Sequence, residues 1–116
     1  MEYSTQALID SRMKLAELRN ALRILKHTVE KTRLKVEAEA ITKADGNYGK
    51  NAEERERYLK LAINESIEYV NMEDEILSLQ IALELEEAKI ESLRDLRREA
   101  EMNLKERMID SNVNFE

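Results

Sequence analysis

The stretch Asp45-Gly46-Asn47-Tyr48-Gly49-Lys50-Asn51 holds both glycines of the 116-residue chain, which contains no proline. Glycine readily takes the left-handed conformation that closes the C-terminal end of a helix, so Gly46 predicts that a helix stops here. Asn51 is a good N-cap, and Glu54 three residues later fits a capping box at the start of a new helix. The stretch therefore predicts a turn over residues 45–51 between two helices.

The residues before this turn carry a seven-residue repeat. Apolar side chains recur at Leu8, Leu15, Leu22, Val29 and Val36. A heptad repeat puts its apolar residues on one stripe of a helix and turns that stripe toward a partner helix. We predict one long helix over about residues 3–45.

The residues after the turn predict a second long helix over residues 52–110, because no Gly or Pro interrupts them. A break at Asn64-Glu65-Ser66 is an alternative, since these poor helix formers can cap a helix. The break would leave a short helix after the turn and a last helix as long as the first. Residues 111–116 lack a helical pattern, so we predict that they form a frayed tail. The predicted fold is all-α, a single domain over residues 1–110 in which two long antiparallel helices form a coiled-coil hairpin.

The last helix is apolar on two sides. One heptad seam runs through Ile76, Leu79, Leu83, Ile90 and Leu93, with interruptions at Glu86 and Arg97. A second line, here named the self-association stripe, consists of Leu77, Ile81, Leu85 and Ala88. A helix with two apolar sides needs two partners. We predict that the seam packs on the first helix and that the stripe joins two hairpins as a homodimer with four helices. The alternative is that Ala52–Ile63 folds over the stripe within one chain.

Charge is segregated along the chain, whose formal net charge is −6. Eight basic and two acidic residues lie between Arg12 and Lys35, whereas Leu61 to Ala88 holds eight acidic residues and no basic one. Opposite charges on the two halves favour their antiparallel pairing over other registers. We also predict an acidic face that binds a protein partner, formed by Glu65, Glu68, Glu73, Asp74, Glu75, Glu84 and Glu87. Negative charge and few aromatic residues disfavour strong binding to nucleic acid.

The sequence holds no recognisable chemical site. His27 is the only histidine and cysteine is absent, which excludes catalytic triads and metal sites built from several His or Cys ligands. One remote enzyme alternative is an all-α Mg²⁺-dependent nucleotide phosphohydrolase, whose metal ligands would be Glu84, Glu87, Glu91 and Asp95 on one helical face. That chemistry needs more carboxylates on a facing helix, and the first helix supplies mainly Arg and Lys. We predict a chain that is not an enzyme and has no catalytic, cofactor or metal site.

The chain also lacks the patterns of membrane proteins. No apolar run approaches the roughly 18 residues of a membrane span, and the first residues do not resemble a signal peptide. We expect a cytoplasmic protein.

The segment Gly49-Lys50-Asn51-Ala52-Glu53-Glu54-Arg55-Glu56 lies between a long basic amphipathic helix and a second long helix. With this segment and this layout, the chain resembles small helix-loop-helix proteins encoded by tailed bacteriophages and prophages. The resemblance implies synthesis in the cytoplasm of a bacterial host and transfers no catalytic or binding residue. We therefore predict a phage-encoded helical protein–protein interaction module, an accessory factor or inhibitor of nucleic-acid or host-defence machinery. The alternative function is a structural spacer, scaffold or assembly chaperone.

Overall fold

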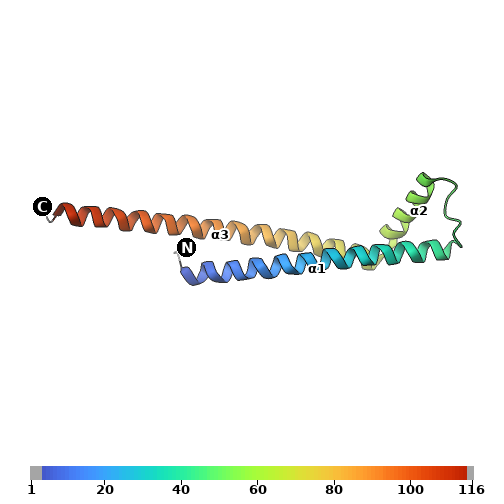
Figure 1. Cartoon of the computed structure of the whole chain (residues 1–116), viewed down its shortest axis with the longest axis horizontal. Helices are drawn as coiled ribbons and strands as arrows, with labels where there is room; N and C mark the ends of the chain where they lie inside the picture. The colour runs from blue at the N-terminus through green and yellow to red at the C-terminus, as the bar shows by residue number, and fades with distance from the viewer. Residues whose placement is uncertain (1–3, 115–116) are drawn as a thin grey trace. The chain divides into compact units, whose positions relative to one another are not determined.

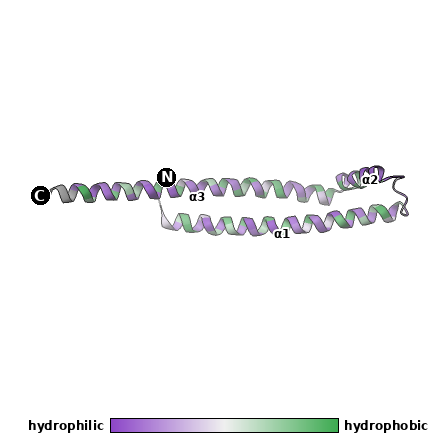
Figure 2. Ribbon diagram, turned by 45° about the horizontal axis from the view of Figure 1, so that its top comes forward, coloured by the Kyte–Doolittle hydropathy of each residue, from purple (hydrophilic) through white to green (hydrophobic). Residues whose placement is uncertain are grey.

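The computed structural model describes residues 4–114, and over this range the chain is all-α. Its three helices are α1 (Thr5–Lys43), α2 (Ala52–Glu65) and α3 (Ile67–Asn114), and no strand occurs among the described residues. Hydrophilic and hydrophobic residues alternate around both long helices (Figure 2), as expected for helices that bury only one stripe.

The turn forms where the sequence predicts it, with one difference in its chemistry. The Gly46 amide donates to the Ile41 carbonyl at 3.0 Å and the Asp45 amide to the Thr42 carbonyl at 3.1 Å, which is the bonding pattern of a Schellman motif. Both Asp45 (φ 53°) and Gly46 (φ 74°) are left-handed. The first left-handed position belongs to Asp45, because a short polar side chain also tolerates this region.

The start of α2 is capped as predicted. The Asn51 side chain accepts a hydrogen bond from the Glu54 amide at 2.9 Å. The Glu54 carboxylate reaches back to the Lys50 amide at 2.8 Å, one residue before the usual partner in a capping box. Gly49 is required for another reason, since a Cβ placed there would lie 2.7 Å from the Arg55 amide nitrogen.

The chain breaks at Ser66, so the broken-helix alternative is the one that the structure has. Ser66 is extended (φ −76°, ψ 109°), its amide donates to the Ile63 carbonyl and its hydroxyl accepts from the Tyr69 amide at 3.3 Å. The same serine thereby ends α2 and caps α3, which is the use of a short hydroxyl side chain at a helix boundary.

The predicted end of the last helix is wrong. We expected α3 to stop near residue 110, before a frayed tail over residues 111–116, but it continues to Asn114. Residues 115 and 116 of that tail lie outside the described residues. The two long helices also differ in length, with 39 residues in α1 and 48 in α3, so the break does not equalise them.

Contacts group the chain into two compact units. Unit 1 combines α1 up to Leu18 with α3 from Ala82 onward, and unit 2 is Arg19–Ile81. In unit 1 the two helical segments lie side by side (Figure 1) around a core of Leu8, Leu15, Ile90 and Leu93. Of the seam residues, Leu93 is fully buried in this core and Leu83 packs against it.

Unit 2 contains the rest of α1, the turn, α2 and the beginning of α3. Thr32 of α1 is buried and its hydroxyl donates to the Met72 sulfur of α3 at 3.5 Å. The Tyr58 hydroxyl of α2 donates to the Ala40 carbonyl of α1 at 3.2 Å. The Tyr58 ring also lies 5.9 Å from the Tyr48 ring of the turn. These contacts place α2 on the end of α1.

Candidate functional site

The self-association stripe is exposed along its whole length. In unit 2, Leu77 and Ile81 are 58% and 59% exposed, and in unit 1 Leu85 is 68% exposed and Ala88 is also exposed. Burying a large apolar side chain is worth about 1.5 to 3 kcal/mol, so three such residues in water forgo substantial stabilisation. The stripe is therefore available for contact with another molecule.

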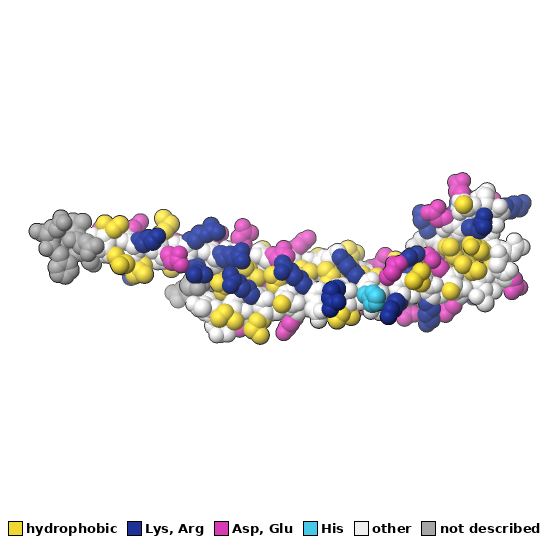
Figure 3. Space-filling view, viewed as in Figure 1, with side chains coloured by type: hydrophobic (Ala, Val, Ile, Leu, Met, Phe, Trp, Pro, Cys, Tyr) yellow, Lys and Arg dark blue, Asp and Glu magenta, His cyan; other side chains and the backbone are white. Residues whose placement is uncertain are grey.

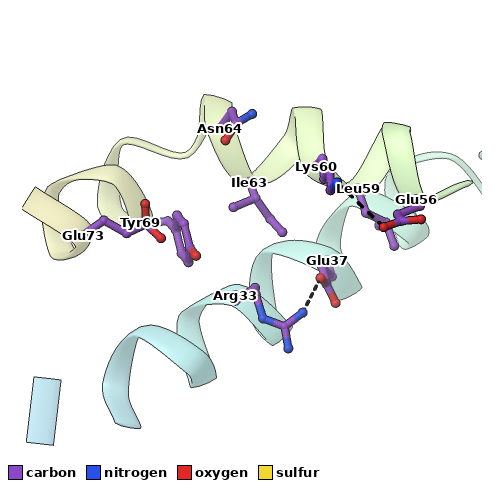
Figure 4. Close-up of a pocket in the computed structure, with 9 residues that line it drawn as sticks. All are labelled: Arg33, Glu37, Glu56, Leu59, Lys60, Ile63, Asn64, Tyr69 and Glu73. Carbon is purple, nitrogen blue, oxygen red and sulfur yellow. Dashed lines mark hydrogen bonds and ion pairs between the residues drawn. The ribbon is translucent and has the colours of Figure 1, made fainter. Parts of the chain in front are cut away.

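The intramolecular cover considered for this stripe is wrong for Leu77 and Ile81. The segment Ala52–Ile63 lies in α2, whose Leu59 and Ile63 line a groove with Arg33, Glu37 and Tyr69. Figure 4 shows Ile63 and Tyr69 pointing toward α1 beside Arg33. Because α2 uses its apolar side chains on the end of α1, it leaves Leu77 and Ile81 exposed.

Charged groups dominate this groove next to α2. The Arg33 guanidinium donates to the Glu37 carboxylate at 2.6 Å and also to Glu30, both within α1. The hydrogen bond from Arg33 lowers the pKa of Glu30. A hydrogen bond with Glu73, together with burial, raises the pKa of Tyr69. The positive charge of Arg33 is thus held by two carboxylates of its own helix, at the i,i+3 and i,i+4 spacings that favour the helical conformation.

The predicted acidic partner face is solvent-exposed at every position. Its members divide between the two units, with Glu65, Glu68, Glu73, Asp74 and Glu75 in unit 2 and Glu84 and Glu87 in unit 1. Asp74 and Glu73 precede Leu77 by three and four residues, so all three lie on one side of α3. In unit 2 the acidic residues and the stripe therefore share a surface.

The four carboxylates of the remote enzyme alternative, Glu84, Glu87, Glu91 and Asp95, are all exposed. Asp95 pairs with Arg98 of the same helix at 3.6 Å. Within the part of the chain that the structure describes, no group of three or more His, Cys, Asp or Glu side chains is arranged to hold a metal ion. His27, the single histidine, lies at the surface (Figure 3).

Sequence reasoning missed one group in unit 1, the carboxylate of Glu86. We treated Glu86 as an interruption of the seam, but it is only 5% exposed. Its Oε2 lies 3.8 Å from the Lys14 ammonium, and its Oε1 has no hydrogen-bond partner among the described residues. The Ser11 hydroxyl, on the seam of α1 between Leu8 and Leu15, is likewise buried, with no hydrogen-bond partner among the residues that the structure describes. The signal was the heptad position of Glu86, four residues before Ile90.

A scan against protein-family models, a search of curated proteins and a search of solved structures each found no match to this chain. No helix among the described residues is both long enough and apolar enough to cross a membrane.

Proposed function

We propose that this chain is a non-catalytic helical interaction module that works by presenting the outer surface of α3 to other protein chains. The observation that carries the proposal is the exposure of Leu77, Ile81 and Leu85 on a helix whose opposite side already packs on α1. Large apolar residues repeated on one side of an otherwise charged helix mark interaction sites. The nearby acidic residues favour a partner with basic groups.

The architecture that we propose for the module is an antiparallel coiled-coil hairpin of α1 and α3, with α2 folded on the end of α1. Two such hairpins lie side by side in a homodimer of four long helices. The core of unit 1 and the Thr32–Met72 contact of unit 2 both support the pairing of α1 with α3. The uncovered stripe supports the second copy.

In the cell, we propose that the module is a phage-encoded accessory factor or inhibitor of nucleic-acid or host-defence machinery, acting in the host cytoplasm. Support for the origin comes from the resemblance of residues 49–56. Support for the mode of action comes from the acidic surface, because clustered carboxylates can occupy a basic cleft that otherwise binds phosphates.

Affinity capture with the tagged chain tests the proposal. The wild type should retain a specific protein from the host, and Glu65→Lys with Glu68→Lys on the acidic face should lose it. Glu91→Lys with Glu99→Lys is the matched control, since both residues are exposed on α3 but lie outside that face. Retention of the same protein by the acidic-face variant would refute a role for that face.

A second candidate is a structural spacer or scaffold, and one observation favours it. Beyond the core of unit 1, the end of α3 exposes several large apolar residues, namely Met102, Leu104, Met108 and Ile109. If these residues form a second interaction surface on each chain, dimers could associate further into larger assemblies. An assembly whose mass keeps rising with concentration would favour this candidate over the first.

A further inference from the structure

The segment of α3 that carries the exposed apolar residues of unit 2 bears only negatively charged side chains. From Ile67 to Ile81 the helix carries Glu68, Glu73, Asp74 and Glu75 and no basic residue. Laying a second α3 on Leu77 and Ile81 would bring carboxylates close to carboxylates as water is removed. Like charges facing each other in an interface cost several kcal/mol. The surface is thus built to reject another copy of α3 and to accept a basic, apolar helix.

Within unit 2, α1 offers a surface of that kind. Ile24, Lys31 and Lys35 follow one another at spacings of seven and four residues, so they share one side of the helix. Ile24 is 53% exposed and both lysines are exposed. Among the described residues, neither Lys31 nor Lys35 forms an ion pair. Their charges are therefore available to a second molecule.

An apolar groove accompanies this side of α1. The groove lies between α1 and α3 of unit 2. It is lined by Ala21, Ile24, Leu25 and Thr28 of α1 and by Glu75, Ser78 and Leu79 of α3. It is open to solvent and mostly apolar. A groove of this kind accepts the large apolar residues of an amphipathic helix.

The spacings on the two helices match when the helices run in opposite directions. Ile24 and Lys31 are seven residues apart on α1, and Ile81 and Asp74 are seven residues apart on α3. At 1.5 Å per residue both separations are about 10.5 Å. With Ile81 opposite Ile24 of another copy, Asp74 lies opposite Lys31, and Glu73 lies toward Lys35.

We infer that the dimer forms through reciprocal contacts of α3 with α1 of the second copy, in which Leu77 and Ile81 enter the groove beside Ile24. This inference rests on the self-association proposed above and specifies which faces meet. In a twofold dimer the contact occurs twice, since α1 of each copy receives α3 of the other. Two carboxylates, Glu73 and Asp74, face two ammonium groups, Lys31 and Lys35, at each contact.

Charge reversal on each face tests the inference, using the full chain throughout. One variant carries Lys31→Glu with Lys35→Glu, and the other carries Glu73→Lys with Asp74→Lys. Each variant alone brings like charges together at both contacts. We expect its dimer dissociation constant to rise about tenfold or more. The matched control is Arg23→Glu with Lys26→Glu, the same change of charge elsewhere around α1, which should dimerise like the wild type.

Mixing the two charge-reversal variants in equal amounts is the decisive step. In the mixed dimer both contacts again join opposite charges, so light scattering should show the dimer mass at a concentration where each variant alone is a monomer. Circular dichroism should show that both variants keep the helicity of the wild type.

The possible outcomes distinguish failure of the proposed contact between α3 and α1 from failure of self-association itself. A wild type that stays monomeric at high micromolar concentration refutes self-association and the inference together. A dimeric wild type whose lysine variant dimerises equally well refutes only the contact between α3 and α1, and points to pairing of α3 with α3. Failure of the mixture to recover the dimer also overturns the inference.

Discussion

Replacing the buried carboxylate of unit 1 should stabilise the protein. Glu86 lies on the seam between α1 and α3, four residues before the buried Ile90. Its only ion-pair partner among the described residues is Lys14, whose side chain is 64% exposed. One carboxylate oxygen has no hydrogen-bond partner in that part of the chain. Glu86→Leu puts an apolar side chain of similar size in this position.

The expected gain follows from three contributions. Burying a leucine side chain is worth about 1.5 to 3 kcal/mol. Removing a buried acceptor that lacks a partner relieves a penalty of about 1 to 3 kcal/mol. Losing an ion pair with a mostly exposed lysine costs about 0 to 1 kcal/mol. We expect the free energy of unfolding to rise by about 2 to 4 kcal/mol, after allowing for imperfect packing of the new side chain.

Urea unfolding followed by circular dichroism measures this change, and Glu84→Leu is the control. Glu84 lies two residues earlier on α3 and is exposed, so the same substitution there should change stability by about 0.5 kcal/mol or less. A Glu86→Leu variant less stable than the wild type would refute the reasoning. It would show that the carboxylate makes a favourable interaction which the burial of a leucine cannot replace.

Three further predictions concern the turn and α1, and thermal unfolding followed by circular dichroism measures each of them. Asn51→Ala should lower the free energy of unfolding by about 1 kcal/mol, because the Glu54 amide loses its acceptor; an unchanged stability would show that water replaces the cap. Gly49→Ala should destabilise the protein, since the new Cβ would lie 2.7 Å from the Arg55 amide nitrogen, and a neutral result would mean that the turn relaxes freely. The pKa of Glu30 is lowered from 4.5 in the folded protein by its hydrogen bond with Arg33. The stability that this carboxylate contributes is therefore present above pH 4.5 and is lost as the pH falls through the lower, folded pKa. Glu30→Gln should remove this part of the loss of stability in acid and leave the dependence of stability on pH unchanged above pH 6. The same loss of stability in acid for the variant and the wild type would contradict the assignment.

The elements that the sequence predicts well are those specified by local chemistry. The turn, its two helix caps and the break at Ser66 follow from Gly46, Asn51 and the polar residues 64–66, all within a few residues of where they act. The seam contact of unit 1 follows from the heptad repeat. These signals are local or periodic, so they can be read from the sequence without knowledge of tertiary packing.

The remaining features depend on contacts between segments that are distant in the sequence. The end of α3 was misplaced because residues 111–114 carry no apolar repeat, yet they continue an uninterrupted helix without Gly or Pro. The position of α2 depends on the Tyr58 hydrogen bond to Ala40, which no repeat predicts. The burial of Glu86 was missed because an acidic residue normally marks an exposed position.

The stripe itself could be predicted from spacing, but its exposure could not. From the sequence, either a second chain or the segment after the turn could pack on Leu77 and Ile81. The position of α2 in the structure shows that the segment after the turn does not pack on them. Lys31 and Lys35 were visible in the sequence as part of a basic stretch. Their alignment with Asp74 and Ile81 emerges only when exposed and buried sides of both helices are known.

The molar mass of the wild-type chain in solution tests the central claim most directly. Size-exclusion chromatography with multi-angle light scattering should give twice the chain mass of 13.6 kDa at micromolar concentration. Leu77→Glu with Ile81→Glu should give a monomer with unchanged helicity, because both residues are exposed within one chain. A wild type that elutes as a monomer at high micromolar concentration, or a stripe variant that remains a dimer, would contradict the account.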